Sequence, residues 1–185
     1  MGDSLRLKYF LCITSLILIW IPQLGRGNID LYYILSYPIC FNVEDVGFFI
    51  AIAGSIQQFV TVAFIRGCQL INIREELTAA ASCVFGIAHF IVFGFAKTTT
   101  TIYLAAAIYV FKFACVPILR SVMSKLTPED KQGSLFGVIA LFENICTMVG
   151  SVLAGAIYSA TVPIYEGFVF FVMAGFYVVA TVLIL

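Results

Sequence analysis

The stretch that decides the fold covers residues 9–35 and reads YFLCITSLILIWIPQL (9–24), GRGNID (25–30) and LYYIL (31–35). No charged residue lies between Tyr9 and Leu24. A helix needs about 20 apolar residues to cross the hydrocarbon core of a bilayer. The stretch therefore predicts one membrane-spanning helix with a local break at 25–30. A signal peptide is the alternative, because Arg6 and Lys8 precede the run, but no small-residue cleavage site follows it.

Five further apolar runs follow along the chain. Overall, 62% of the residues are hydrophobic and 11% are charged, whereas a soluble domain is about half apolar and a quarter charged. The runs do not alternate apolar and polar residues, as strands of a membrane barrel would. We therefore expect an all-α membrane protein, with residues 1–185 forming one bundle of six transmembrane helices. The predicted spans are 9–36, 46–65, 77–96, 99–119, 134–158 and 164–185.

The composition argues against several other classes of protein. The net charge is zero, so no basic field attracts nucleic acid. The six cysteines form no C-x-x-C pair and the chain has one histidine, so neither a metal site nor another cofactor is expected. No nucleophile, acid and base cluster on a predicted loop, so we do not expect an enzyme.

Lysine and arginine are distributed unevenly between the loops, which predicts the orientation in the membrane. Cytoplasmic loops carry the excess of these residues. The N-terminus and the two loops expected on its side contain seven of them, against two on the opposite side. Both termini are therefore expected in the cytoplasm. The seven are Arg6, Lys8, Arg66, Arg74, Arg120, Lys125 and Lys131, and the two are Arg26 and Lys97.

Two ionisable residues are expected near the middle of the membrane. At 1.5 Å per residue, Glu143 lies roughly 15 Å inside the fifth span and Lys112 roughly 12 Å inside the fourth. Charged groups at this depth commonly mark proton relays or substrate contacts. We predict that they pair with each other. Alternatively, Glu143 makes a structural hydrogen bond and Lys112 extends toward the cytoplasm.

Other polar residues are candidates for a transport site. Arg120, at the end of the fourth span, could hold an anion or form a gate, or could anchor the helix at the headgroups. Arg26 and Asp30 occupy positions i and i+4 in the broken part of the first span and could pair there. Broken helices are where transporters place binding sites.

Polar side chains within the spans could line a cavity. Gln57 and Asn144 are the substrate-cavity candidates, and either could instead bond neighbouring helices. Of Gln57 and Gln58, one must face away from lipid. His89 could accept a proton or make a helix–helix hydrogen bond. Small residues in the fifth span predict close packing against another helix, namely Gly137, Gly150, Ser151, Ala154, Gly155 and Ala156.

Several motifs in the chain resemble those of a known family. They are PILRSVMSKL (117–126), QGSLF (132–136), YSATV (158–162) with Gly167-Phe168, and YPICF (37–41) with VGF (46–48). The set is similar to the C-terminal half of proton-coupled folate transporter-like solute carriers, which belong to the major facilitator superfamily. The resemblance implies helices seven to twelve of a twelve-helix carrier that works by alternating access.

The resemblance also implies a function and a partner. Arg120 matches the family's arginine at the inner end of helix ten, which acts in proton coupling and substrate binding. Gly54 stands where the folate transporter has a functional histidine in helix eight. We expect proton-coupled uptake of a small organic solute, a folate-like anion being one candidate, in the plasma or lysosomal membrane. The six spans and the free Cys40 suggest a missing N-terminal six-helix half or a second copy. The alternative is a truncated, non-transporting protein that associates with a full-length transporter.

Overall fold

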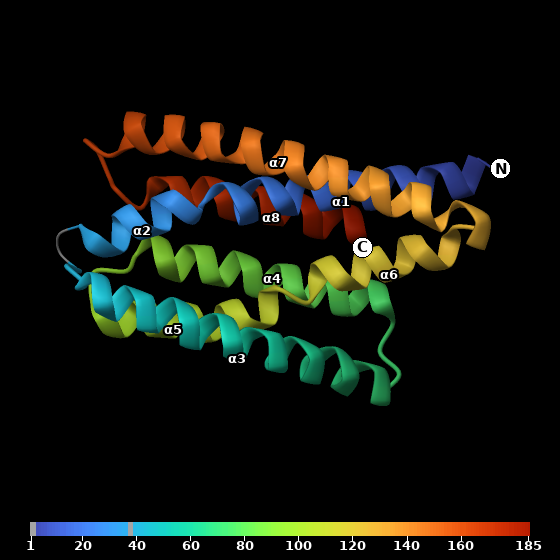
Figure 1. Cartoon of the computed structure of the whole chain (residues 1–185), viewed down its shortest axis with the longest axis horizontal. Helices are drawn as coiled ribbons and strands as arrows, with labels where there is room; N and C mark the ends of the chain where they lie inside the picture. Colours follow the sequence, from blue (N-terminus) through green and yellow to red (C-terminus); the bar gives the residue numbers. More distant parts are fainter. Residues whose placement is uncertain (1–2, 37–38) are drawn as a thin grey trace.

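The computed structural model describes residues 3–36 and 39–185, and this part of the chain is α-helical with no strand. Figure 1 shows the helices running roughly parallel to one long axis. Their bounds are α1 Asp3–Gly25, α2 Gly27–Leu35, α3 Val43–Leu70, α4 Glu75–Gly94, α5 Thr99–Lys112, α6 Cys115–Leu126, α7 Gln132–Thr161 and α8 Phe168–Ile184, with a 3₁₀ turn, η1, at Glu129–Lys131.

Six apolar helical segments account for this fold. Five are long and apolar enough to cross a membrane, and α8 is a shorter apolar helix of 17 residues. Two of the five are broken helices, α1 with α2 and α5 with α6. The prediction of an all-α, six-helix membrane fold is confirmed. Of the motif at 37–41, Tyr37 and Pro38 lie outside the described residues.

The two breaks have different origins. The first was predicted, and Arg26 is its only residue outside α1 and α2, flanked by two glycines that lower helix propensity. The second, at Phe113 and Ala114, was not predicted and divides the expected span 99–119. Pro117 explains it, because proline has no N–H to donate to the carbonyl of Phe113 and its ring clashes with that carbonyl.

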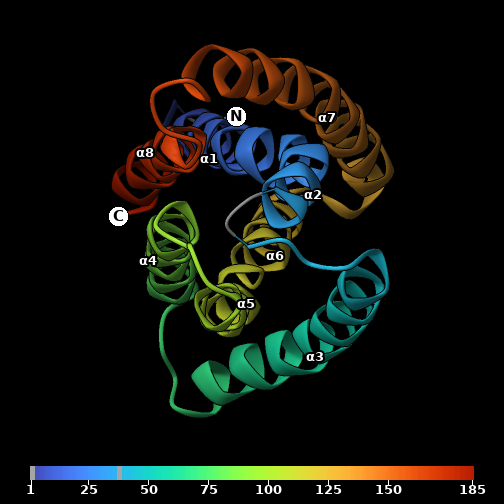
Figure 2. The same ribbon diagram turned by 90° about the vertical axis from the view of Figure 1, so that its left-hand side faces the viewer.

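Helix packing places α1 and α4 at the centre of the bundle. α1 packs on α7 and α8, α4 packs on α8 and α5, and α3 packs mainly on α5. Figure 2, an end-on view, shows α3 and α7 at opposite edges of the arrangement, with α2, α5 and α6 between them. Both edge helices are therefore less buried than the broken helices and α4.

The crossing of α1 and α7 depends on two glycines. A Cβ atom added at Gly150 would overlap the backbone oxygen of Ile21, and one added at Gly25 would overlap the backbone of Gly150. The predicted close packing of the fifth span is thus right at Gly150 and at buried Ala154. It is wrong at Gly137 and Gly155, where an added Cβ meets nothing within 4 Å.

The connections with the predicted cytoplasmic charges gather at one end of the molecule. Figure 1 shows the N-terminus, the α3–α4 connection and the α6–α7 connection together at its right-hand side. The α2–α3 and α4–α5 connections and the α7–α8 loop lie at the other end. The fold therefore separates the two sets of loops, as helices that cross a membrane in alternating directions require.

Candidate functional site

A cavity of about 310 Å³ lies beside the break between α1 and α2. Its wall combines apolar and aromatic residues with a few polar side chains, as ligand pockets typically do. The polar groups come from four helices, α2, α3, α4 and α5, and from the break itself. They are Arg26, Asp30, Gln57, His89 and Tyr109.

Arg26 joins these helices through two strong contacts. Its Nε lies 3.2 Å from Oδ2 of Asp30, which confirms the predicted i,i+4 pair. Its Nη1 lies 2.6 Å from Nε2 of His89 on α4. The guanidinium also lies over the Tyr109 ring, with Cζ 4.7 Å from the ring centroid. Because Arg26 is only 8% exposed, these contacts are shielded from solvent and hold its charge at the cavity wall.

Lys112 does not pair with Glu143, so that prediction is wrong. Its side chain is 1% exposed, and its Nζ has no hydrogen-bond partner among the described residues. The ammonium lies 4.1 Å from the ring centroid of Phe90 and 5.0 Å from those of Tyr109 and Tyr177. Lys112 is the last residue of α5, and the break that follows lets α6 take a different course. Lys112, before the break, therefore does not share the neighbours of α6, the helix after the break.

Glu143 pairs instead with Arg120. Nη2 of Arg120 donates to Oε2 of Glu143 at 2.6 Å, which links α6 to α7. The Arg120 guanidinium also lies over Trp20 of α1, 5.5 Å from the ring centroid. Both charged side chains are about one-third exposed, at 34% and 38%. The pair therefore lies on an open side of the bundle, accessible to water or to another chain.

The remaining candidates fall in different places. Gln57 is buried at the 310 Å³ cavity, whereas its neighbour Gln58 is exposed. Gly54 lines the same cavity, and a Cβ added there would meet nothing within 4 Å. Asn144 is exposed on α7, and its Nδ2 donates to the carbonyl of Ala140 in the same helix. Gln57 is thus placed to contact a ligand in this cavity, and Asn144 is not among its lining residues.

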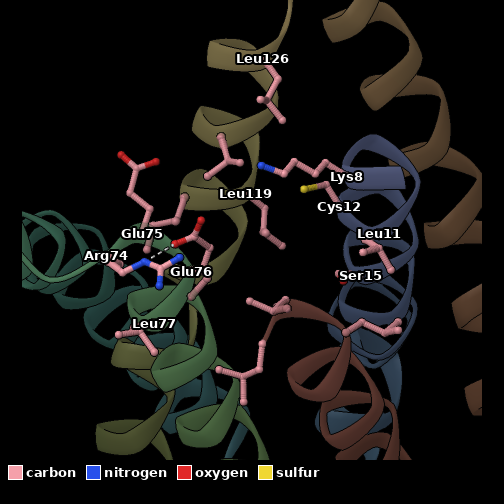
Figure 3. Close-up of a pocket in the computed structure, with 16 residues that line it drawn as sticks. Lys8, Leu11, Cys12, Ser15, Arg74, Glu75, Glu76, Leu77, Leu119 and Leu126 are labelled. Atoms are coloured by element: carbon pink, nitrogen blue, oxygen red, sulfur yellow. Dashed lines mark ion pairs between the residues drawn. The ribbon is translucent and has the colours of Figure 1, made fainter. Parts of the chain in front are cut away.

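A second cavity, of about 380 Å³, opens at the end of the molecule that holds the N-terminus. In Figure 3, Lys8 and Cys12 of α1 face Arg74, Glu75 and Glu76 at the start of α4 across this space. Lys125 of α6 also forms an ion pair with Glu75. Arg74 and Glu76 pair with each other, with 3.3 Å between Nε and Oε2. Both carboxylates here are thus paired, and Lys8 is the lining base for which the described residues provide no ion pair.

Aromatic residues are the part of the site that sequence reasoning missed. Phe90, Tyr109 and Tyr177 surround the two cations, and the hydroxyl of Tyr177 donates to Oε1 of Gln23 at 2.9 Å. The sequence held a partial signal, because Tyr109 lies one helical turn before Lys112. Tyr177 had none, since it lies in a span without charge. The contribution of α8 depends on tertiary packing.

Comparison with known proteins places the chain among transporters. No protein-family model matches it. It is 24% identical to the proton-coupled folate transporter of Rattus norvegicus over 98% of this chain and 39% of the relative. It is 28% identical to the lysosomal proton-coupled steroid conjugate and bile acid symporter of Homo sapiens, over 91% of this chain and 36% of the relative. It is 30% identical to the Gallus gallus symporter of the same name, over 81% of this chain and 32% of the relative.

These relatives agree in class and in the extent of the match. All are named as transporters or symporters, and none of these names describes an enzyme. The chain spans about two fifths of the length of the relatives it matches, or less. The chain is therefore similar, over most of its length, to proton-coupled solute carriers of the major facilitator superfamily, and the match corresponds to their C-terminal half.

Proposed function

We propose that this chain supplies one half of a proton-coupled carrier that takes up a small organic anion by alternating access. The observation that carries the proposal is the Arg26–Asp30–His89 cluster on the wall of a cavity at a broken helix. Polar groups are expensive inside a membrane and are kept there mainly for ion or substrate pathways. The substrate class follows from the relatives, whose names specify folate, steroid conjugates and bile acids.

The driving force is a proton gradient. Each pH unit contributes about 1.4 kcal/mol per proton, and each 100 mV of membrane potential contributes about 2.3 kcal/mol per charge. Together they are enough for concentrative uptake. Arg120 and Glu143, which join α6 to α7 on an open side of the bundle, are proposed as a second coupling element. Lys112, which lies over the same Tyr109 ring as Arg26, is proposed to add positive charge next to the Arg26–Asp30–His89 cluster.

The rest of the carrier is proposed to cover the open sides of this half. α3 and α7 expose large apolar residues, among them Phe59 and Met148, and these faces suit lipid or a partner helix bundle. An N-terminal six-helix half or a second copy would complete the passage. We propose that both termini face the cytoplasm, in the plasma or lysosomal membrane.

The test is uptake by proteoliposomes that contain the purified chain. An acidic exterior and a neutral interior are imposed, and entry of radiolabelled taurocholate, estrone sulfate and folate is followed with and without a protonophore. Accumulation of at least one anion that collapses with the protonophore supports the proposal. Uptake that ignores both the pH gradient and the voltage overturns the coupling.

A non-transporting role is the second candidate. It is favoured by the short match, since the chain covers about two fifths of its relatives. In this case the chain would associate with a full-length transporter and would carry nothing itself. The expected result is co-purification with a full-length relative and no uptake by proteoliposomes of this chain alone.

A further inference from the structure

His89 is held in one protonation state by its two hydrogen bonds. The imidazole is 2% exposed, with Nδ1 2.8 Å from the carbonyl oxygen of Ala105 and Nε2 2.6 Å from Nη1 of Arg26. A guanidinium only donates hydrogen bonds, and a carbonyl only accepts them. Nε2 must therefore be the acceptor and Nδ1 must carry the proton. In this arrangement His89 is a neutral imidazole that cannot take a second proton while Arg26 stays in place.

Arg26 is the donor on which this restriction depends. Its Nη1 is used by His89 and its Nε by Asp30, and the guanidinium lines the 310 Å³ cavity. Carboxylates and sulfates bind guanidinium groups through paired, charge-assisted hydrogen bonds. Because Asp30 occupies Nε, an anion that binds through paired N–H groups uses Nη1 and Nη2 and competes with Nε2 of His89 for Nη1.

The charges around His89 favour such an anion. Arg26 and Asp30 face it from the α1–α2 break, and Lys112 lies nearby at the end of α5. Tyr109 of α5 and Tyr177 of α8 are the titratable hydroxyls of the cluster, and Gln57 of α3 adds an uncharged amide. One carboxylate thus faces two basic side chains, and neither Lys112 Nζ nor Asp30 Oδ1 has a hydrogen-bond partner in the described structure. A bound anion would balance the excess positive charge.

We infer that Arg26 switches between His89 and an anionic group of the substrate, so that anion binding and protonation of His89 occur together. The inference rests on the proposed carrier function and names the groups that couple its two substrates. When the anion takes the guanidinium, Nε2 of His89 becomes free and accepts a proton, which gives an imidazolium next to the anion. When the anion leaves, Arg26 returns and the proton is released. By linkage, the proton must then raise the affinity for the anion as much as the anion raises the affinity for the proton.

The single histidine of the chain gives a direct test. The protein is labelled with ¹⁵N-histidine, purified through a tag without histidine and placed in lipid nanodiscs, where its spectrum contains the two nitrogen signals of a single imidazole ring. Without ligand at pH 6, the spectrum should show the neutral tautomer with the proton on Nδ1. Saturating taurocholate, whose sulfonate stays ionised, should convert it to the imidazolium. A ring that stays neutral with taurocholate bound overturns the inference.

A matched variant separates this inference from the carrier function. His89→Gln can still accept from Arg26 and donate to the Ala105 carbonyl, but cannot take a proton. For the unmodified protein, one proton per anion predicts a taurocholate affinity that rises about tenfold for each unit of falling pH. In His89→Gln that dependence should shrink to less than about twofold, while Lys97→Gln, an exposed loop change, should behave like the unmodified protein.

The outcomes distinguish a failure of the His89 inference from a failure of the carrier proposal. If His89→Gln keeps the full pH dependence and Asp30→Asn loses it, Asp30 carries the proton and the inference is wrong, although the carrier proposal stands. If taurocholate, estrone sulfate and folate neither bind nor enter proteoliposomes that contain the unmodified protein, either alone or with the N-terminal six-helix half of a relative, the carrier proposal itself fails, and the inference fails with it.

Discussion

Lys112 and Arg120 lie eight residues apart in one apolar segment, yet only Arg120 has a carboxylate partner. The pairing of Arg26 with Asp30 could be predicted because residues four apart on a helix meet whatever the tertiary structure. The pairing of Glu143 could not, because it depends on how α6 and α7 are rotated about their axes. Depth in the membrane limits the possible partners but does not choose among them.

Exchanging the two charges of the Arg120–Glu143 pair tests that contact. Arg120→Glu and Glu143→Arg should each lower the melting temperature of the purified protein, because each places two like charges together. The double variant should recover part of the loss, with a coupling free energy of about 1 kcal/mol for a pair that is about one-third exposed. Additive losses in the double variant would contradict the pairing.

Replacing Lys112 with methionine tests the cost of its buried charge. The ammonium has aromatic neighbours but no hydrogen-bond acceptor among the residues that the structure describes, and an unpaired buried charge destabilises the folded state. Methionine has a similar shape and removes the charge, so Lys112→Met should stabilise the protein by about 1–3 kcal/mol in thermal unfolding. Lys97→Met, on an exposed loop, is the control and should change little. A clear loss of stability in Lys112→Met would show that the ammonium has a partner.

Among the helices, the long apolar runs were readily predicted and the interruptions only partly. Glycines and charges interrupt the first span at 25–30, and these are visible in the sequence. The break at Phe113 and Ala114 lies within an apolar stretch, and its only sequence signal is Pro117, three residues later. Proline within transmembrane helices is often tolerated, so the sequence alone does not decide whether a proline kinks a span or breaks it.

Two glycines of α7 offer a matched test of the crossing with α1. Gly150→Ala places a methyl group against the backbone of Ile21, whereas Gly155→Ala places one in open space. Gly155→Ala should leave stability unchanged or raise it by up to about 1 kcal/mol, since alanine favours helix. Gly150→Ala should lower it by about 1–3 kcal/mol through overpacking. Equal thermal stabilities for the two variants would contradict the close crossing.

For the whole molecule, composition was enough to predict an all-α membrane fold, and loop motifs were enough to predict the similarity to proton-coupled solute carriers. The arrangement of the site was not, because the cavity combines residues from α2, α3, α4 and α5, and no local pattern shows that these helices meet. His89 illustrates the difference, since its two open interpretations could be compared only once its partners were known.

The most direct test of the account asks whether water and solute reach the cavity wall at Gly54. In vesicles that contain Gly54→Cys, a membrane-impermeant thiol reagent is added to either side and the modified residue is located by mass spectrometry. The account predicts that Gly54→Cys is labelled from at least one side and that taurocholate slows the labelling. Phe59→Cys, on the exposed apolar face of the same helix, should stay unlabelled. Failure to label Gly54→Cys from either side would contradict a solute passage through this cavity.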